Sequence, residues 1–95
     1  MIHLFLFVWL AGQAGTSDAL EHVQAGLEAR KQHQIEVEIT EFRKATESDP
    51  NLADAFVNLG AAYMEKHDYG AAIAPLKHAL ELSPGNTVDN PDFIV

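Results

Sequence analysis

Residues 53–86 read ADAFVNLGAAYMEKHDYGAAIAPLKHALELSPGN, and this stretch decides the fold. Four of its residues lie on one face of a helix with a 3.6-residue period: Phe56, Leu59, Gly60 and Tyr63. Because Gly60 has no side chain, a second helix can approach that face closely. The stretch therefore predicts a helix that packs against a neighbour through Gly60.

The second half of the stretch supplies that neighbour. Ala72 and Ala79 offer small surfaces, and larger apolar residues surround them: Ile73, Leu76 and Leu80. Residues 66–70 form a short polar connection of the length that joins neighbouring helices. Pro84 and Gly85 then end the second helix, because Pro cannot continue a helix and Gly tolerates left-handed geometry. We expect an antiparallel helix hairpin.

The order of these residues resembles a known family. An aromatic residue, Leu-Gly, Tyr, Ala, an apolar residue, Ala and Pro on a 34-residue period are the signature of the tetratricopeptide repeat (TPR). Phe56 stands here for the usual Trp, and Leu76 for the usual Phe. The resemblance implies stacked helix-turn-helix hairpins. It also implies that the first helix of each pair lines a concave surface, which holds a peptide or a helix of a partner.

A shift of the chain by 34 residues reveals an earlier and more degenerate copy. Eight residues recur: Ala19, Val23, Gly26, His33, Ile39, Ala45, Glu47 and Pro50 match Ala53, Val57, Gly60, His67, Ile73, Ala79, Glu81 and Pro84. Three signature positions are changed, since His22 replaces the aromatic residue, Ala25 the Leu and Ala29 the Tyr. We therefore expect a thinner core in the first repeat.

Glu38 is a further departure from the second copy. It aligns with Ala72, at a helix crossing that favours a methyl group. Its carboxylate must either bend outward or be buried at a cost in free energy.

We predict an all-α fold of antiparallel helix-turn-helix hairpins, stacked as a short TPR-like α-solenoid. Its parts are an apolar N-terminal segment at 1–15, a degenerate repeat at 16–50, a repeat at 51–86 and an irregular tail at 87–95. We expect helices at about 18–32, 35–48, 52–66 and 70–82, with Ser17 as the N-cap of the first.

The composition argues against several kinds of partner and site. Fourteen acidic and six basic side chains give a net charge of −8, which repels nucleic acid and anionic membrane surfaces. The chain has no cysteine, so disulfides, thiolate metal sites and thiol nucleophiles are excluded. A chain of 95 residues makes at most one small domain, so a catalytic domain does not fit beside the repeats.

Candidates for chemistry are few. His33 and His67 lie in equivalent loops one repeat apart, but polar residues are ordinary at helix C-termini. Glu36, Glu38 and Glu41 follow one helix, as charges on an exposed helix face do. We predict that the chain is not an enzyme and has no catalytic residue, metal site, cofactor or small-molecule substrate.

The first helix of each repeat supplies the predicted binding face. Its predicted partner-binding residues are Leu20, Val23, Leu27, Arg30, Asp54, Val57, Asn58, Ala61, Met64 and Glu65. The middle of this face is apolar and its ends are charged, as in a binding groove with a polar rim. The alternative is that the N-terminal segment or further repeats cover the face. Of the paired Lys and Asn with which some family members hold a terminal carboxylate, Asn58 alone is present, so we do not expect that clamp.

The N-terminal segment is almost wholly apolar from Ile2 to Ala11 (IHLFLFVWLA), and small residues follow it. A run of ten residues, nine of them apolar, is too short to cross a bilayer, which needs about 20. The segment resembles a secretory signal peptide cut after Ala14 or Gly15, although no Lys or Arg stands near Met1. It implies export to the periplasm or the medium. The alternatives are a retained segment that packs on the repeats in a cytoplasmic protein, and a start codon placed inside a longer segment.

The tail offers no capping helix. Residues 85–95 are short and rich in Asn, Asp and Pro, whereas repeat arrays usually end with a polar helix that covers the last apolar face. Either the chain is part of a longer array, or its N-terminal segment or a second copy covers that face. Self-association through the uncapped repeat is therefore one expectation. Recognition of the terminal Phe93-Ile94-Val95 by strand addition is another.

These features together predict a protein interaction module that binds a peptide or a helix of a partner protein. The alternative is the accessory repeat region of a longer exported enzyme, whose catalytic domain lies outside this sequence.

Overall fold

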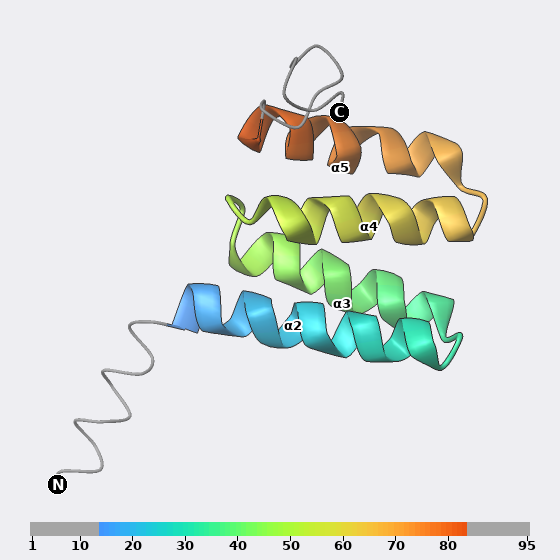
Figure 1. Cartoon of the computed structure of the whole chain (residues 1–95), viewed down its shortest axis with the longest axis horizontal. Coiled ribbons are helices and arrows are strands. Elements are labelled where there is room, and N and C mark those ends of the chain that lie inside the picture. The colour runs from blue at the N-terminus through green and yellow to red at the C-terminus, as the bar shows by residue number, and fades with distance from the viewer. Residues whose placement is uncertain (1–13, 84–95) are drawn as a thin grey trace, which may run out of the picture.

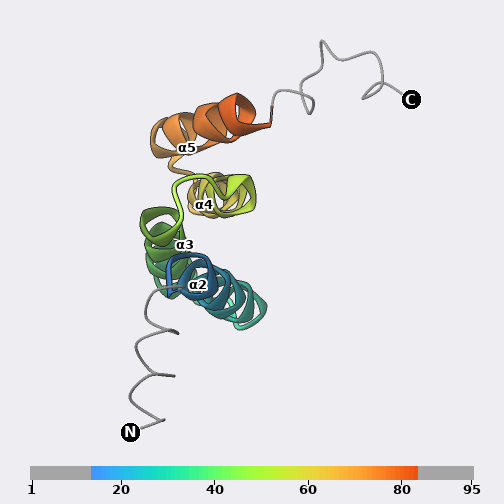
Figure 2. The same cartoon turned by 90° about the vertical axis from the view of Figure 1, so that its left-hand side faces the viewer.

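The computed structural model describes residues 14–83, which form four helices. These are α2 (Ala14–Lys31), α3 (Ile35–Ser48), α4 (Ala53–Glu65) and α5 (Tyr69–Leu82). In Figure 1 they run side by side as two antiparallel hairpins, α2–α3 and α4–α5, and α3 packs against α4. Figure 2 shows the four helices one after another from α2 to α5. The predicted all-α solenoid of helix hairpins is confirmed.

Most predicted helix bounds agree with the structure to about one residue, but the start of the first helix does not. α2 begins at Ala14, so Ser17 lies inside the helix and the prediction that it is the N-cap is wrong. Residues 14–17 include no Pro, and Ser is compatible with a helix interior, so nothing in this stretch stops the helix. Apart from Ala14 and Gly15, the predicted N-terminal segment lies outside the described residues, as does the tail at 84–95.

Each hairpin turns through a histidine in the left-handed backbone region. His33 has φ 58°, and its N–H donates to Arg30 O at 3.1 Å, while Gln34 N–H donates to Ala29 O at 2.9 Å. This pair of bonds is the Schellman motif, whose left-handed position is usually a Gly. A helix end therefore explains the polar residue at position 33.

The second hairpin repeats this geometry. His67 has φ 66°, and its N–H donates to Met64 O at 2.9 Å, while Asp68 N–H donates to Tyr63 O at 2.8 Å. Asp68 then caps α5, because its Oδ1 accepts from Ala71 N–H at 3.2 Å.

Two glycines set how closely the helices of each hairpin approach. A Cβ placed on Gly26 would lie 2.5 Å from the ring of Phe42, and a Cβ on Gly60 would lie 2.5 Å from Leu76 Cγ. These two contacts are 34 residues apart along the chain. The predicted close approach at Gly60 is confirmed, and the first hairpin is built in the same way.

The core lies where α4 packs on the first hairpin. Its buried residues are Val23, Ile39, Phe42, Ala45, Ala55, Leu59 and Ala62. By contrast, α5 buries two alanines, Ala72 and Ala79. The expectation of a thinner core in the first repeat is therefore wrong for the described residues, because α4 covers that repeat and none of the described helices covers the outer face of α5.

Polar contacts replace the lost signature residues of the first repeat. His22 stands where the second repeat has Phe56, and its Nδ1 lies 2.7 Å from Glu41 Oε2 on α3. Between the hairpins, Arg43 Nη2 donates to Tyr63 Oη at 2.6 Å, and Lys66 Nζ lies 2.9 Å from Glu36 Oε1.

Among the described helices, none is both long and apolar enough to cross a membrane.

Candidate functional site

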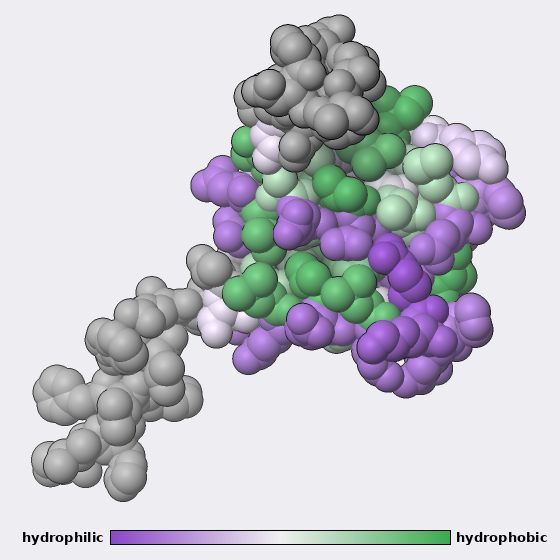
Figure 3. Space-filling model, viewed as in Figure 1, coloured by the Kyte–Doolittle hydropathy of each residue, from purple (hydrophilic) through white to green (hydrophobic). Residues whose placement is uncertain are grey.

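The predicted binding residues occupy α2 and α4, but they do not share one environment. Leu20, Val57 and Met64 are about half exposed, and Asp54 and Glu65 are exposed beside them. The others on this face are partly buried: Leu27, Arg30, Asn58 and Ala61. In Figure 3 apolar residues gather over α2 and again toward α5, with polar residues between the two patches.

Val23 lies in the core rather than at the surface. Only 9% of it is exposed, and it packs in the cluster that α4 closes over the first hairpin. Its equivalent, Val57, stays on the surface because none of the described helices follows α5. Burial by the next helix is a tertiary effect that the helical projection does not include.

Arg30 is the centre of a polar cluster at the C-terminal ends of α2 and α4. Its Nε donates to Glu38 Oε1 at 2.8 Å and also lies 3.1 Å from Glu65 Oε1. Its Nη1 donates to Asn58 Oδ1 at 3.3 Å. The guanidinium carbon lies 5.3 Å from the centre of the Phe42 ring, within range of a cation–π contact. Arg30 thus ties three helices together and is largely engaged within the chain.

Glu38 is buried in this cluster, with 1% of its surface exposed. Burial raises the pKa of its carboxyl group above the ordinary 4.5, and the Arg30 guanidinium opposes that rise without cancelling it. Of the two outcomes expected for this carboxylate, the structure has the buried one. Sequence reasoning did not foresee Arg30 as its partner.

Asn58 also has its side chain occupied. Its Oδ1 accepts from Arg30, and its Nδ2 donates to Asp54 O at 2.8 Å. The amide is therefore engaged in hydrogen bonds within the chain.

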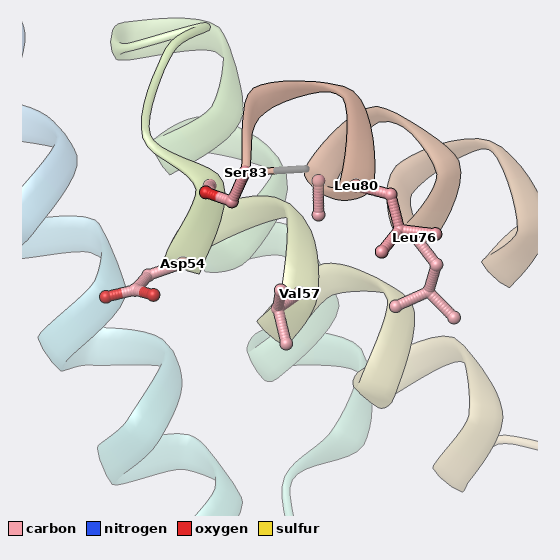
Figure 4. A pocket seen from close by; sticks show the side chains of 7 residues that line it. Asp54, Val57, Leu76, Leu80 and Ser83 are labelled. Carbon is pink, nitrogen blue, oxygen red and sulfur yellow. The ribbon is translucent and has the colours of Figure 1, made fainter. Parts of the chain in front are cut away.

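A groove of about 300 Å³ lies between α4 and α5. It is lined by Ala53, Asp54, Val57, Leu76, Ala79, Leu80 and Ser83. Figure 4 shows Val57 of α4 and Leu76 and Leu80 of α5 around the groove, with Asp54 and Ser83 toward one end. Sequence reasoning placed Leu76 and Leu80 inside the hairpin. The two repeats differ at this position, because Leu80 stands where the first repeat has Thr46.

The described residues contain no group of three or more His, Asp or Glu side chains close enough to hold a metal ion. His67 Nδ1 lies 2.9 Å from Tyr69 Oη, and His78 Nε2 lies 3.3 Å from Pro50 O. His67 therefore has a partner two residues along the chain, whereas His78 has one in the loop between α3 and α4.

Comparison with known proteins finds a family match for part of the chain. Residues 41–74 match the tetratricopeptide repeat, beginning in α3, covering α4 and ending in α5. This stretch of the chain is therefore similar to a tetratricopeptide repeat. The match starts inside the degenerate copy and continues into the well-matched one, so it joins the two hairpins.

One relative is a much larger protein. Over 71 residues this chain is 27% identical to the formate-dependent nitrite reductase complex bifunctional subunit NrfFG of Haemophilus influenzae. The aligned stretch covers 75% of this chain and 18% of the relative.

Proposed function

We propose that this chain is a protein interaction module that binds a peptide or a helix of a partner protein across the α2–α4 face. The observation that carries the proposal is the row of half-exposed apolar side chains on the first helices of both repeats, Leu20, Val57 and Met64. Single exposed apolar residues are ordinary on protein surfaces. Their grouping on the face that TPR proteins use for partners favours a binding surface. TPR modules are typically non-catalytic, in keeping with this role.

The chemistry of the face favours an apolar partner segment. Arg30 is paired with Glu38 and Glu65, so it offers little to an anionic ligand. Asp54 is exposed, and the chain has a net charge of −8. A peptide with apolar anchors and flanking basic residues fits this surface better than an acidic one.

The test replaces exposed apolar residues on both helices of the face. Leu20→Lys with Met64→Lys should remove the partners that the wild-type chain captures in a cross-linked pull-down, while the circular dichroism of the helices stays unchanged. Val37→Lys with Tyr69→Lys is the matched control, because these residues are equally exposed but lie on α3 and α5. Equal loss of partners in both variants, or retention in the first, would contradict the α2–α4 face as the binding site.

We also propose that the chain is exported, on the basis of the apolar residues 2–11 and the small residues after them. N-terminal sequencing of the native protein tests this. A mature chain that begins at Gly15 or Thr16 supports export, and a retained Met1 contradicts it.

A second candidate function is suggested by the relative in Haemophilus influenzae. That protein is a bifunctional subunit of an enzyme complex, and this chain aligns with less than a fifth of it. The repeats would then be the accessory, partner-binding region of a longer exported enzyme. Reading the coding sequence past the codon for Val95 decides between the two, since the second candidate requires a catalytic domain in the same frame.

A further inference from the structure

The internal repeat allows each residue of the second hairpin to be compared with its equivalent in the first. Ile39 is 4% exposed and Ile73 is 66% exposed, although both are isoleucines at the same place in a hairpin. Val23 is 9% exposed and Val57 is 47% exposed. The side chains are the same, so the difference lies in what covers them.

In the first hairpin the cover is α4. Val23, Ile39, Phe42 and Ala45 form one buried cluster with Ala55, Leu59 and Ala62, and Leu52 packs against it. The covering face of α4 thus carries apolar or small residues at spacings of three, four and three, the pattern of one helix face. Of the second-hairpin equivalents of Val23, Ile39, Phe42 and Ala45, three line the groove between α4 and α5: Val57, Leu76 and Ala79.

We infer that this end groove, lined by Val57, Leu76, Ala79 and Leu80, binds an amphipathic helix of another protein, together with the exposed Ile73 of α5. The helix carries Leu or Ala at the spacing of Leu52, Ala55, Leu59 and Ala62. It lies on the second hairpin as α4 lies on the first. This site shares Val57 with the α2–α4 face, whereas Leu76, Ala79 and Leu80 lie on α5.

A head-to-tail contact with a second copy does not supply this helix. In that arrangement α2 would take the place of α4, and the residues at the four covering positions would be Asp18, Glu21, Ala25 and Glu28. All four are exposed in the structure. Burying three carboxylates against apolar side chains is strongly unfavourable. The outer face of α2 therefore ends the stack on that side.

The sequence after Ser83 does not supply it either. In the same 34-residue register, Asn86, Asp89 and Phe93 stand where α4 has Leu52, Ala55 and Leu59. Pro91 falls inside the stretch that would have to be helical. Two of the three residues at the covering positions are polar, so residues 84–95 do not reproduce the covering face of α4.

The probe for this site is a peptide of residues 51–67 (NLADAFVNLGAAYMEKH), which is the chain's own α4 with its flanking residues. It carries the face that fills the equivalent groove in the first hairpin. A fluorescently labelled peptide should bind the full chain saturably, as measured by anisotropy. The same peptide with Ala55→Glu and Leu59→Asp should bind at least about tenfold more weakly.

Variants of the chain locate the binding. Ile73→Glu with Leu80→Glu should weaken peptide binding at least about tenfold. The helical circular dichroism should stay unchanged, because both residues are exposed in the folded chain. Leu20→Lys with Met64→Lys should leave it unchanged. The proposal for the end groove and the proposal for the α2–α4 face can therefore be contradicted independently of each other.

Four results would overturn the inference. One is no binding by the full chain, and a second is binding that appears only after Phe93→Asp, which would place the tail in the groove. A third is binding insensitive to Ile73→Glu with Leu80→Glu, as expected if the peptide exchanges with the chain's own α4. The fourth is a dimer in sedimentation equilibrium that the same double variant converts to a monomer, which would make a second copy the occupant.

Discussion

The pair Arg30 and Glu38 occupies positions that the second repeat fills with Met64 and Ala72. An ion pair with one buried partner, Glu38, thus stands where the other repeat has an apolar pair. Because the two changes compensate each other, the effect of replacing one residue depends on the other.

Glu38 should make the stability of the fold depend on pH. Its pKa is raised in the folded chain, so between the ordinary 4.5 and that raised value the folded state binds more protons than the unfolded state. Stability therefore falls as pH rises through this interval. Urea unfolding at several pH values should show wild type losing stability relative to Glu38→Gln as pH rises. A relative gain would mean that Arg30 outweighs burial.

Replacing the pair together should differ from replacing one member. Arg30→Met leaves the carboxylate of Glu38 buried without its main partner. It should lower the free energy of unfolding by about 3 kcal/mol, more than the double variant does. Arg30→Met with Glu38→Ala installs the residues of the second repeat and should recover most of that loss. A double-mutant cycle of unfolding free energies measures the coupling. Additive effects would mean that the ion pair seen here does not operate in solution.

His33 has the left-handed backbone conformation that Gly adopts without strain. His33→Gly should therefore stabilise the fold, by about 0.5–1 kcal/mol, since the strain of a side chain at φ 58° is removed. Lys31→Gly, at the last helical position of α2, is the control and should destabilise. Thermal unfolding of both variants checks this, and destabilisation by both would contradict the role assigned to the turn.

At the scale of elements, the helix pairs were predictable because local patterns determine them. The apolar period of α4, the close approach at Gly60 and the stop after Leu82 all follow from residues near in sequence. The start of α2, the ion pair of Glu38 and the burial of Val23 were missed or left open. The last two depend on contacts between residues 8 or more positions apart, which a single helical projection does not contain.

The two packed glycines give a test at this scale. Gly26→Ala should destabilise by about 1–3 kcal/mol despite better helix propensity, because its Cβ would overlap the Phe42 ring. Gly60→Ala should cost less, because Leu76 can change rotamer more easily than a buried ring. Gly70→Ala meets nothing within 4 Å and should be neutral or stabilising. Chemical denaturation gives the order, and a gain at Gly26 would show that the hairpin is not closely packed.

For the whole molecule, the structure implies a gradient of stability. The core joins α2, α3 and α4, whereas α5 contributes Ala72 and Ala79 to the buried set and keeps Ile73 and Leu80 exposed. In repeat proteins each unit is stabilised by its neighbours, so a unit with one neighbour opens more easily than a unit covered on both sides. The end groove therefore lies on α5, which has the fewest buried residues of the four described helices.

Hydrogen exchange should show this gradient directly. Amides of α5 should exchange at least about tenfold faster than amides of α3, through local opening below the global unfolding free energy. The peptide of residues 51–67 binds the folded form of α5 in our proposal, so saturating peptide should slow exchange in α5 more than in α2. The chain with Ile73→Glu and Leu80→Glu should show the gradient without the response to peptide. Uniform exchange across α3 and α5 would mean that the two hairpins unfold as one unit, and that α5 needs no covering helix to be held in place.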